Sequence, residues 1–282
     1  RRRRSDRLCR LPGFARGLAV PAEGMMKVWM RPRRWLLIFT LLALFPAGCG
    51  GKLVGHAEEM RLGHEAARVI EQRFRVCQDQ ELQWLVERIG RRIAASSSRS
   101  DVDFTFRVLE EREINALSVP GYVYVNRGLI NATNANPDEL AAVIAHEVAH
   151  TTERHMAKQM ERVYGATFLL NAFVTENANI NTLAEIAVEL ALRGNSRQDE
   201  RAADAQAVRF MSRAGYDPYG MVRFFERLLK ETGDTRGLNK YLSTHPSTSE
   251  RISRIRALIE KEDLARKALQ PRRSSDVQIA DH

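Results

Sequence analysis

The chain has 282 residues, 44% of them hydrophobic and 28% charged, and its formal net charge is +9. The whole excess lies in residues 1–48, which hold 11 Lys and Arg against 2 Asp and Glu. A basic surface for nucleic acid and a generally basic catalytic domain are therefore not supported.

The first 48 residues predict a targeting segment rather than part of a folded domain. Residues 1–24 begin without Met and show no periodicity, so we expect an upstream extension before a start in residues 25–30. Basic residues follow, and after them comes an apolar run, Trp35–Phe45. This run is too short to span a bilayer as a helix. Residues 25–48 are therefore predicted to be a signal peptide.

Pro46-Ala-Gly-Cys49 resembles the cleavage box of bacterial lipoproteins, although Pro46 stands where an aliphatic residue is usual. Cys49 would be the lipidated first residue, and residues 49–52 a tether. Because Gly50 is not the aspartate that retains lipoproteins in the inner membrane, the resemblance implies the periplasmic face of the outer membrane. Cys77 would then be the single remaining thiol, so it is expected to be a small buried residue outside any disulfide.

The mature chain is long enough for one domain with a full core. Leu53–Val76 and Gln80–Ala95 are predicted helices, and Val102–Leu109 is a predicted strand. A second strand follows a Pro-Gly turn and alternates at the strand period. Its residues are Tyr122, Val123, Tyr124 and Val125. We predict that this is an edge strand beside the next helix, able to pair with an extended peptide; an ordinary strand in the core of the sheet is the alternative.

The next predicted helix contains the pentad His146-Glu-Val-Ala-His150. Asn136 is placed as the N-cap, Pro137 as the first helical residue, and Glu139 as the partner in a capping box. Small and apolar residues surround the pentad, which is typical of a helix buried on nearly all sides.

Two histidines four residues apart lie on one face of a helix. His146 and His150 can therefore bind one tetrahedral metal ion, with Glu147 as general base at its open position. Ordinary core histidines are the alternative, but two imidazoles and a carboxylate buried among alanines would be costly without a metal ion or dense hydrogen bonding. The pentad predicts one zinc ion per chain and hydrolytic chemistry.

Two apolar segments, Tyr164–Val174 and Leu183–Leu192, are too short to cross a membrane. They could pack over the metal site as a lid. The alternative is that they are ordinary helices of the core, which is the usual role of a helix with an apolar face.

A catalytic zinc ion usually has three protein ligands, so one more is needed. The metzincin extension is missing, because Glu153 stands at its glycine position and Met156 at its last histidine position. On a helix capped by Ser196, Glu200 is the candidate ligand, and Asp204 is the candidate carboxylate that orients a ligand histidine. An exposed face that pairs these acids with arginines is the alternative.

Four segments resemble the HtpX/BepA/Oma-type zinc metalloendopeptidases, the forty-eighth metallopeptidase family, over about Leu53–Ile259. These segments are Asn115–Leu129, the pentad helix, Ser196–Asp204 and Thr244–Ile252. The resemblance implies that His146, His150 and Glu200 bind zinc and that Glu147 is the catalytic base. It also implies an α+β glutamate-zincin fold, predominantly helical, with a small β-sheet whose edge strand flanks the active-site helix.

The same resemblance places His245 near the metal. There it would either donate to the developing oxyanion or act as a fourth ligand that keeps the enzyme latent. A histidine capping a surface helix is the alternative. Arg251 is expected in a buried ion pair or in contact with substrate.

The sequence therefore predicts a zinc endopeptidase domain in residues 53–262, followed by a charged, disordered tail in residues 263–282. Its expected substrates are misfolded or misassembled cell-envelope proteins, its expected membrane anchor is the lipid on Cys49, and nucleic acid is not an expected partner. The second hypothesis is a chaperone-like or scaffold module with latent or structural zinc, which a permanent His245 ligand would favour. The oligomeric state is not indicated.

Overall fold

The computed structural model describes residues 55–165, 180–230, 244–245 and 249–269. The predicted signal peptide, Cys49 and the tether lie outside these residues, as does the predicted tail from residue 270. All described residues belong to one compact unit, Lys52–His282. No helix within the described ranges is long and apolar enough to cross a membrane.

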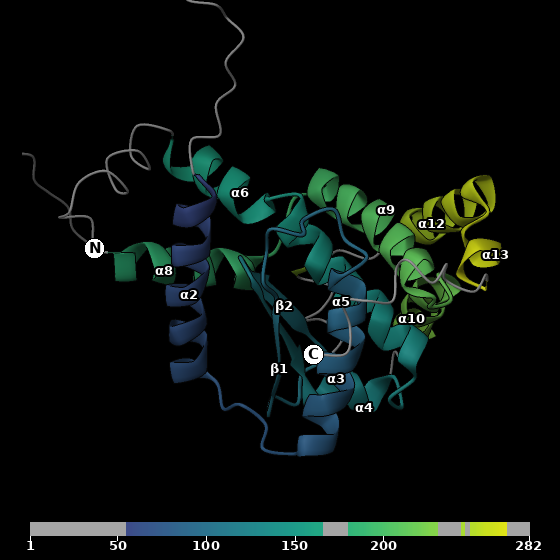
Figure 1. Ribbon diagram of the computed structural model, residues 1–282, viewed down its shortest axis with the longest axis horizontal. Coiled ribbons are helices and arrows are strands. Elements are labelled where there is room, and N and C mark those ends of the chain that lie inside the picture. The colour runs from purple at the N-terminus through teal and green to yellow at the C-terminus, as the bar shows by residue number, and fades with distance from the viewer. Residues whose placement is uncertain (1–54, 166–179, 231–243, 246–248, 270–282) are drawn as a thin grey trace, which may run out of the picture. The chain divides into compact units, whose positions relative to one another are not determined.

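Helices make up most of the described chain (Figure 1). They are α2 (His56–Arg73), α3 (Gln80–Ala94), α4 (Arg127–Ala132), α5 (Pro137–Thr152), α6 (His155–Tyr164), α8 (Ile180–Arg193), α9 (Arg197–Ala214), α10 (Tyr219–Lys230), α12 (Ser249–Glu262) and α13 (Leu264–Ala268). A small mixed sheet accompanies them, so the predicted α+β class is confirmed.

The sheet has three strands in the order β1-β3-β2. β1 (Thr105–Leu109) runs parallel to the central strand β3 (Tyr122–Asn126), and β2 (Ala116–Val119) runs antiparallel to it. β2 is an edge strand, and it packs beside α5.

This strand order corrects one prediction. Tyr122, Val123, Tyr124 and Val125 lie in the central strand β3 and therefore cannot form the edge that receives a peptide. Val123, Tyr124 and Val125 are fully buried, as expected for a strand covered on both faces. The alternative of a strand in the core of the sheet holds, and β2 takes the edge position.

Helices cover both faces of the sheet (Figure 1). One face, which includes Phe106, Val123 and Val125, joins a core shared with α3, α5, α9, α10 and α12. The opposite face, which includes Leu117 and Tyr124, joins a second core shared with α2, α6 and α8. Side chains of a strand point alternately to its two faces, so Ser118 of β2 points toward the α5 side.

α5 begins as predicted, because Asn136 accepts hydrogen bonds from the backbone of Asp138 and Glu139 and Pro137 is the first helical residue. Glu139 is not the capping-box partner: its buried carboxylate instead accepts two hydrogen bonds from Arg227 of α10, both at 2.9 Å. Every residue from Glu139 to Thr151 is buried, so α5 is the central helix of the larger core.

Two predicted boundaries differ from the structure. The first predicted helix ends at Arg73, and Val76 instead forms an isolated bridge with Leu109. Residues 264–268 do not belong to a disordered tail, because Leu264 is buried and starts α13, where its carbonyl accepts a hydrogen bond from Ser212 at 2.7 Å. Cys77 is buried, as predicted.

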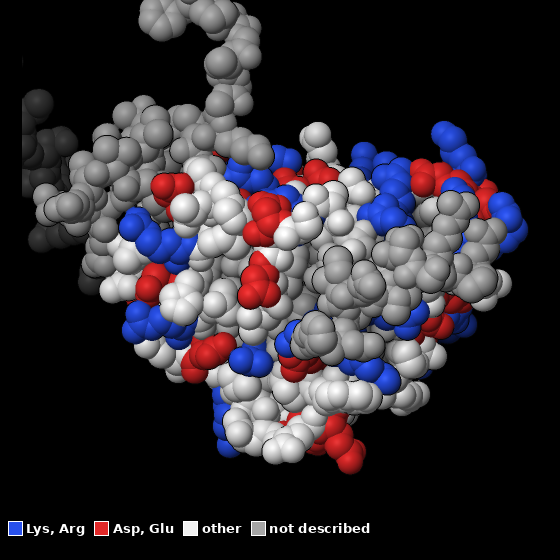
Figure 2. Space-filling model, in the orientation of Figure 1, with Lys and Arg blue, Asp and Glu red and all other residues white. Residues whose placement is uncertain are grey.

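Positive and negative side chains are interspersed on the face shown in Figure 2. This agrees with the balanced charge of the sequence after residue 48.

Candidate metal centre and active site

Three segments bring four metal-binding side chains to one point. α5 contributes His146 and His150, the first turn of α9 contributes Glu200, and the segment Thr244–His245 contributes His245. One ligand atom from each lies within 4.8 Å of all the others, and all four side chains are buried. The alternative in which Glu200 and Asp204 lie on an exposed face is wrong, because they are only 1% and 4% exposed.

The distances within this cluster fit a single zinc ion. Nε2 of His146 lies 3.0 Å from Nε2 of His150 and 3.2 Å from Nδ1 of His245. The Glu200 carboxylate lies 3.2 Å from Nε2 of His146 and 3.3 Å from Nε2 of His150. Tetrahedral ligands bound to zinc at their usual bond lengths lie roughly 3.3 Å apart. Imidazole and carboxylate are also the ligand types of catalytic zinc sites.

Asp204 and Arg251 lie directly behind the cluster. Oδ1 of Asp204 is 3.1 Å from Nδ1 of His146, the nitrogen that faces away from the other donors. Arg251 donates to both oxygens of Asp204, at 2.8 and 2.7 Å, and its Nη1 lies 3.2 Å from Glu200. Arg251 is thus in a buried ion pair, and Asp204 is placed to hold the ring of His146.

Glu147 is buried beside the four donors. Its Oε2 accepts a hydrogen bond from Ser118 Oγ at 2.8 Å, whereas Oε1 accepts none from the described residues. Nε2 of His245 lies 3.4 Å from that Oε1. Ser118 lies within Asn115–Leu129 but was not predicted as a site residue, because its contact with Glu147 depends on which strand borders α5.

Residues 79–259 match the model of peptidase family M48. The chain belongs to this family. With the buried donor cluster, the match confirms the predicted family, the class of zinc metallopeptidase and a single zinc site at His146, His150 and Glu200.

Several curated relatives resemble this M48 chain. The beta-barrel assembly-enhancing protease of Escherichia coli K12 is 25% identical over 217 residues, which are 73% of this chain and 45% of the relative. A Vibrio cholerae protein provisionally given the same name is 32% identical over 208 residues, 70% of this chain and 43% of the relative. The mitochondrial metalloendopeptidase OMA1 of Arabidopsis thaliana is 33% identical over 180 residues, 62% of this chain and 36% of the relative. The chain therefore spans less than half the length of these relatives.

The charged groups of the M48 site lie close together and shift one another's pKa values. Burial disfavours a charged His146, but Glu200 and Asp204 outweigh it and raise the pKa of His146 to about 10. Burial would likewise raise the pKa of Glu200, but His245 and His146 hold it well below its usual range. Burial lowers the pKa of His150. The cluster therefore keeps an ionised carboxylate in its core, which a proton or a metal cation must balance.

His155, the first residue of α6, is a second site residue that was not predicted from the sequence. It is 2% exposed, and its Nδ1 lies 2.8 Å from Nδ1 of His150. Burial, and next the neighbouring His150, lower the pKa of His155 to about 3. The available signal was a third histidine, five residues after His150, but in a continuous helix that spacing places the two side chains on different faces.

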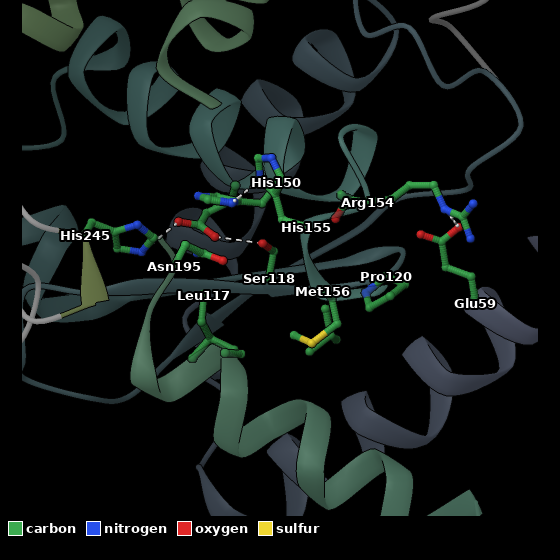
Figure 3. Close-up of a pocket in the computed structure, with 14 residues that line it drawn as sticks. Glu59, Leu117, Ser118, Pro120, His150, Arg154, His155, Met156, Asn195 and His245 are labelled. Atoms are coloured by element: carbon green, nitrogen blue, oxygen red, sulfur yellow. Dashed lines mark hydrogen bonds and ion pairs between the residues drawn. The ribbon is translucent and has the colours of Figure 1, made fainter. Parts of the chain in front are cut away.

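A narrow pocket runs from the M48 metal site along β2 (Figure 3). His150 and His245 lie near one end, and Glu59 and Arg154 lie at the other. Leu117, Ser118, Val119 and Pro120 line its length, and Ala191 and Asn195 come from the end of α8 and the residues after it. Its volume of about 20 Å³ is near the minimum that one water molecule needs, so a peptide chain requires it to widen.

The two predicted apolar segments are placed differently by the structure. Leu183–Leu192 lies in α8, which packs on the second core as an ordinary helix while its end reaches the pocket. Most of Tyr164–Val174 lies outside the described residues.

Proposed function

We propose that this protein is a zinc endopeptidase that hydrolyses peptide bonds in unfolded polypeptide segments. The observation that carries the proposal is the position of Glu147, beside the zinc ligands, with Oε2 held by Ser118 and Oε1 accepting no hydrogen bond from described residues. When bound, zinc acts as a Lewis acid and lowers the pKa of water. Glu147 takes a proton from the attacking water and returns it to the leaving amine.

β2 is the strand with which we propose the substrate pairs. The backbone N–H of Asn126 donates to the carbonyl of Asn115, and the register pairs Ser118 with Val123. Because hydrogen-bonded pairs alternate along an antiparallel ladder, the backbone groups of Ser118 face away from β3. An extended peptide added there would lie opposite Glu147. Pairing through the main chain requires little of the substrate's side chains, which suits an enzyme that cuts misfolded segments.

We further propose that the substrates are misfolded or misassembled cell-envelope proteins, in periplasmic quality control. The names of the Escherichia coli and Vibrio cholerae relatives support a role near β-barrel assembly. The proposed anchor is a lipid on Cys49 that holds the enzyme at the periplasmic face of the outer membrane. Labelling with palmitate that persists unchanged in Cys49→Ala would refute the anchor.

The deciding experiment measures zinc content and cleavage of an unfolded model protein, with wild type, Glu147→Gln and Glu185→Gln. Glu185 is a matched control because its side chain is 63% exposed on α8. We expect about one zinc ion per chain in all three proteins and a loss of about 10²–10⁴-fold in rate for Glu147→Gln alone. Equal cleavage by wild type and Glu147→Gln would refute the proposal.

One observation favours the alternative, a chaperone-like or scaffold module with latent or structural zinc. Nδ1 of His245 lies as close to His146 and Glu200 as the predicted ligands lie to one another, and four protein ligands close a zinc site to water. If the wild type does not cleave, the variant His245→Ala distinguishes a latent peptidase from a binding module. Activity gained in this variant would indicate latency, and inactivity with zinc retained would favour the binding module.

A further inference from the structure

We propose that His155 is the positioning residue of the ligand His150, and that Asp199 holds His155 in turn. This inference rests on the zinc site and not on the proposed peptidase activity. Zinc binding, which tests it, is measured separately from cleavage.

The geometry assigns the role of each nitrogen. His150 directs Nε2 toward His146 and Glu200, so its Nδ1 faces away from the metal. A neutral imidazole that binds metal through one nitrogen carries its hydrogen on the other, and metal-bound histidines usually donate that hydrogen to a fixed acceptor. The nearest partner is Nδ1 of His155, at 2.8 Å and buried, which must therefore accept.

Asp199 fixes the opposite side of the His155 ring. With its Nδ1 accepting, His155 carries its hydrogen on Nε2, and this atom lies 3.6 Å from Oδ1 of Asp199. That separation is longer than a hydrogen bond, so the contact is electrostatic. Asp199 is itself held, because Ser196 Oγ donates to its Oδ2 at 2.7 Å and Arg162 at 2.8 Å.

The two ligand histidines of α5 are thus supported in parallel ways. Behind His146 stand Asp204 and then Arg251. Behind His150 stand His155, Asp199 and then Arg162, ending likewise in a carboxylate paired with an arginine. Asp199 immediately precedes the ligand Glu200 on α9. The same helix turn therefore positions Glu200 directly and positions His150 through His155.

The backbone is bent to bring His155 to this position. Arg154 has a φ of 57°, in the left-handed region that non-glycine residues seldom adopt. It lies between the end of α5 and the start of α6, so the chain changes direction there. Nε of Arg154 lies 3.0 Å from the buried carboxylate of Glu59. Strained backbone of this kind persists where surrounding contacts impose it and clusters at functional sites. Here the bend turns the ring of His155 back onto His150.

Two amide substitutions distinguish this role from simple packing. The oxygen of an asparagine side chain can occupy the place of Nδ1 and accept, whereas the amide of glutamine reaches the place of Nε2. We expect His155→Asn to retain the zinc dissociation constant of the wild type within about threefold. We expect His155→Gln and His155→Ala to weaken zinc binding by about 10–100-fold.

The measurement is zinc competition against a chromogenic chelator, with the whole chain, alongside the melting temperature of each metal-free protein. Zinc affinity unchanged in His155→Ala, or lost equally in the Asn and Gln variants, would overturn the proposal. Should the His155 variants fail to fold, Asp199→Asn replaces them. It is expected to weaken zinc binding severalfold, and unchanged affinity in that variant would also overturn the proposal.

Discussion

At the scale of single residues, the proton on His146 is linked to stability in the metal-free protein. Its pKa is raised from 6.5 to about 10, so folding strengthens proton binding there. That stabilisation is fully present below pH 6.5 and is lost as the pH rises through 10. We expect the melting temperature of the chelator-treated protein to fall across this range, measured by circular dichroism. His146→Gln, which cannot titrate, should show a weaker fall; identical curves would contradict the assignment.

Ser118 offers a second test at this scale. Its hydroxyl is the donor to Oε2 of Glu147, and a hydrogen bond to a charged group contributes about 1.5–3 kcal/mol. We expect Ser118→Ala to lower kcat by about tenfold or more, with zinc content unchanged. Ser253→Ala is the control, because the Ser253 hydroxyl donates to the carbonyl of Ser249 on the exposed surface of α12. Equal kcat values for the two variants would show that Glu147 does not depend on Ser118.

The residues that sequence predicted and those it missed differ in what fixes their positions. His146, Glu147 and His150 share one helix, so their relative geometry follows from the spacing alone. Glu200 and Asp204 are similarly local to one capped helix. Ser118 and His155 depend instead on strand order and on a left-handed residue between two helices, and neither leaves a periodic signal.

At the scale of elements, helices were predicted better than the sheet. α5 carries an Asn cap, an N1 proline and an apolar interior, each of which acts locally. β2 has only four residues, and its place outside β3 results from pairing that the sequence does not encode locally. Tyr122–Val125 has the stronger alternation typical of a strand and was therefore predicted to be the edge, which β2 forms instead.

Gly194 controls how α9 meets the segment that carries His245. Its φ is +90°, and a Cβ there would overlap the backbone of Thr244, whose carbonyl accepts from the N–H of Asn195 at 3.3 Å. We expect Gly194→Ala to lower stability by about 1–3 kcal/mol, because the added Cβ must displace the backbone of Thr244.

Gly165→Ala is the matched control for that measurement. Gly165 has a similar φ of +74°, but no atom of the described residues lies within 4 Å of an added Cβ. Chemical denaturation of both variants therefore separates backbone strain from the close approach to Thr244. An equal loss of stability in the two would mean that the contact with Thr244 contributes nothing.

For the molecule as a whole, a zinc ion bound by His146, His150 and Glu200 connects α5 with α9. A ligand at 1,000 times its dissociation constant stabilises the folded state by about 4 kcal/mol. We therefore expect chelation to lower the melting temperature by on the order of 10 °C, measured by calorimetry. Glu147→Gln should show the same shift, because Glu147 is not among the four donors; a smaller shift in that variant would place Glu147 among the ligands.

The donors of the metal site come from distant parts of the chain, and the polymer physics of loops limits what this costs. Glu200 follows His150 by 50 residues, and His245 follows Glu200 by 45. Closing a flexible loop of this length costs roughly 3.5 kcal/mol by its logarithmic dependence on length, and doubling the loop adds only about 0.6 kcal/mol. Insertions between the ligands are thus inexpensive, so chains that differ greatly in length there can close the same zinc site.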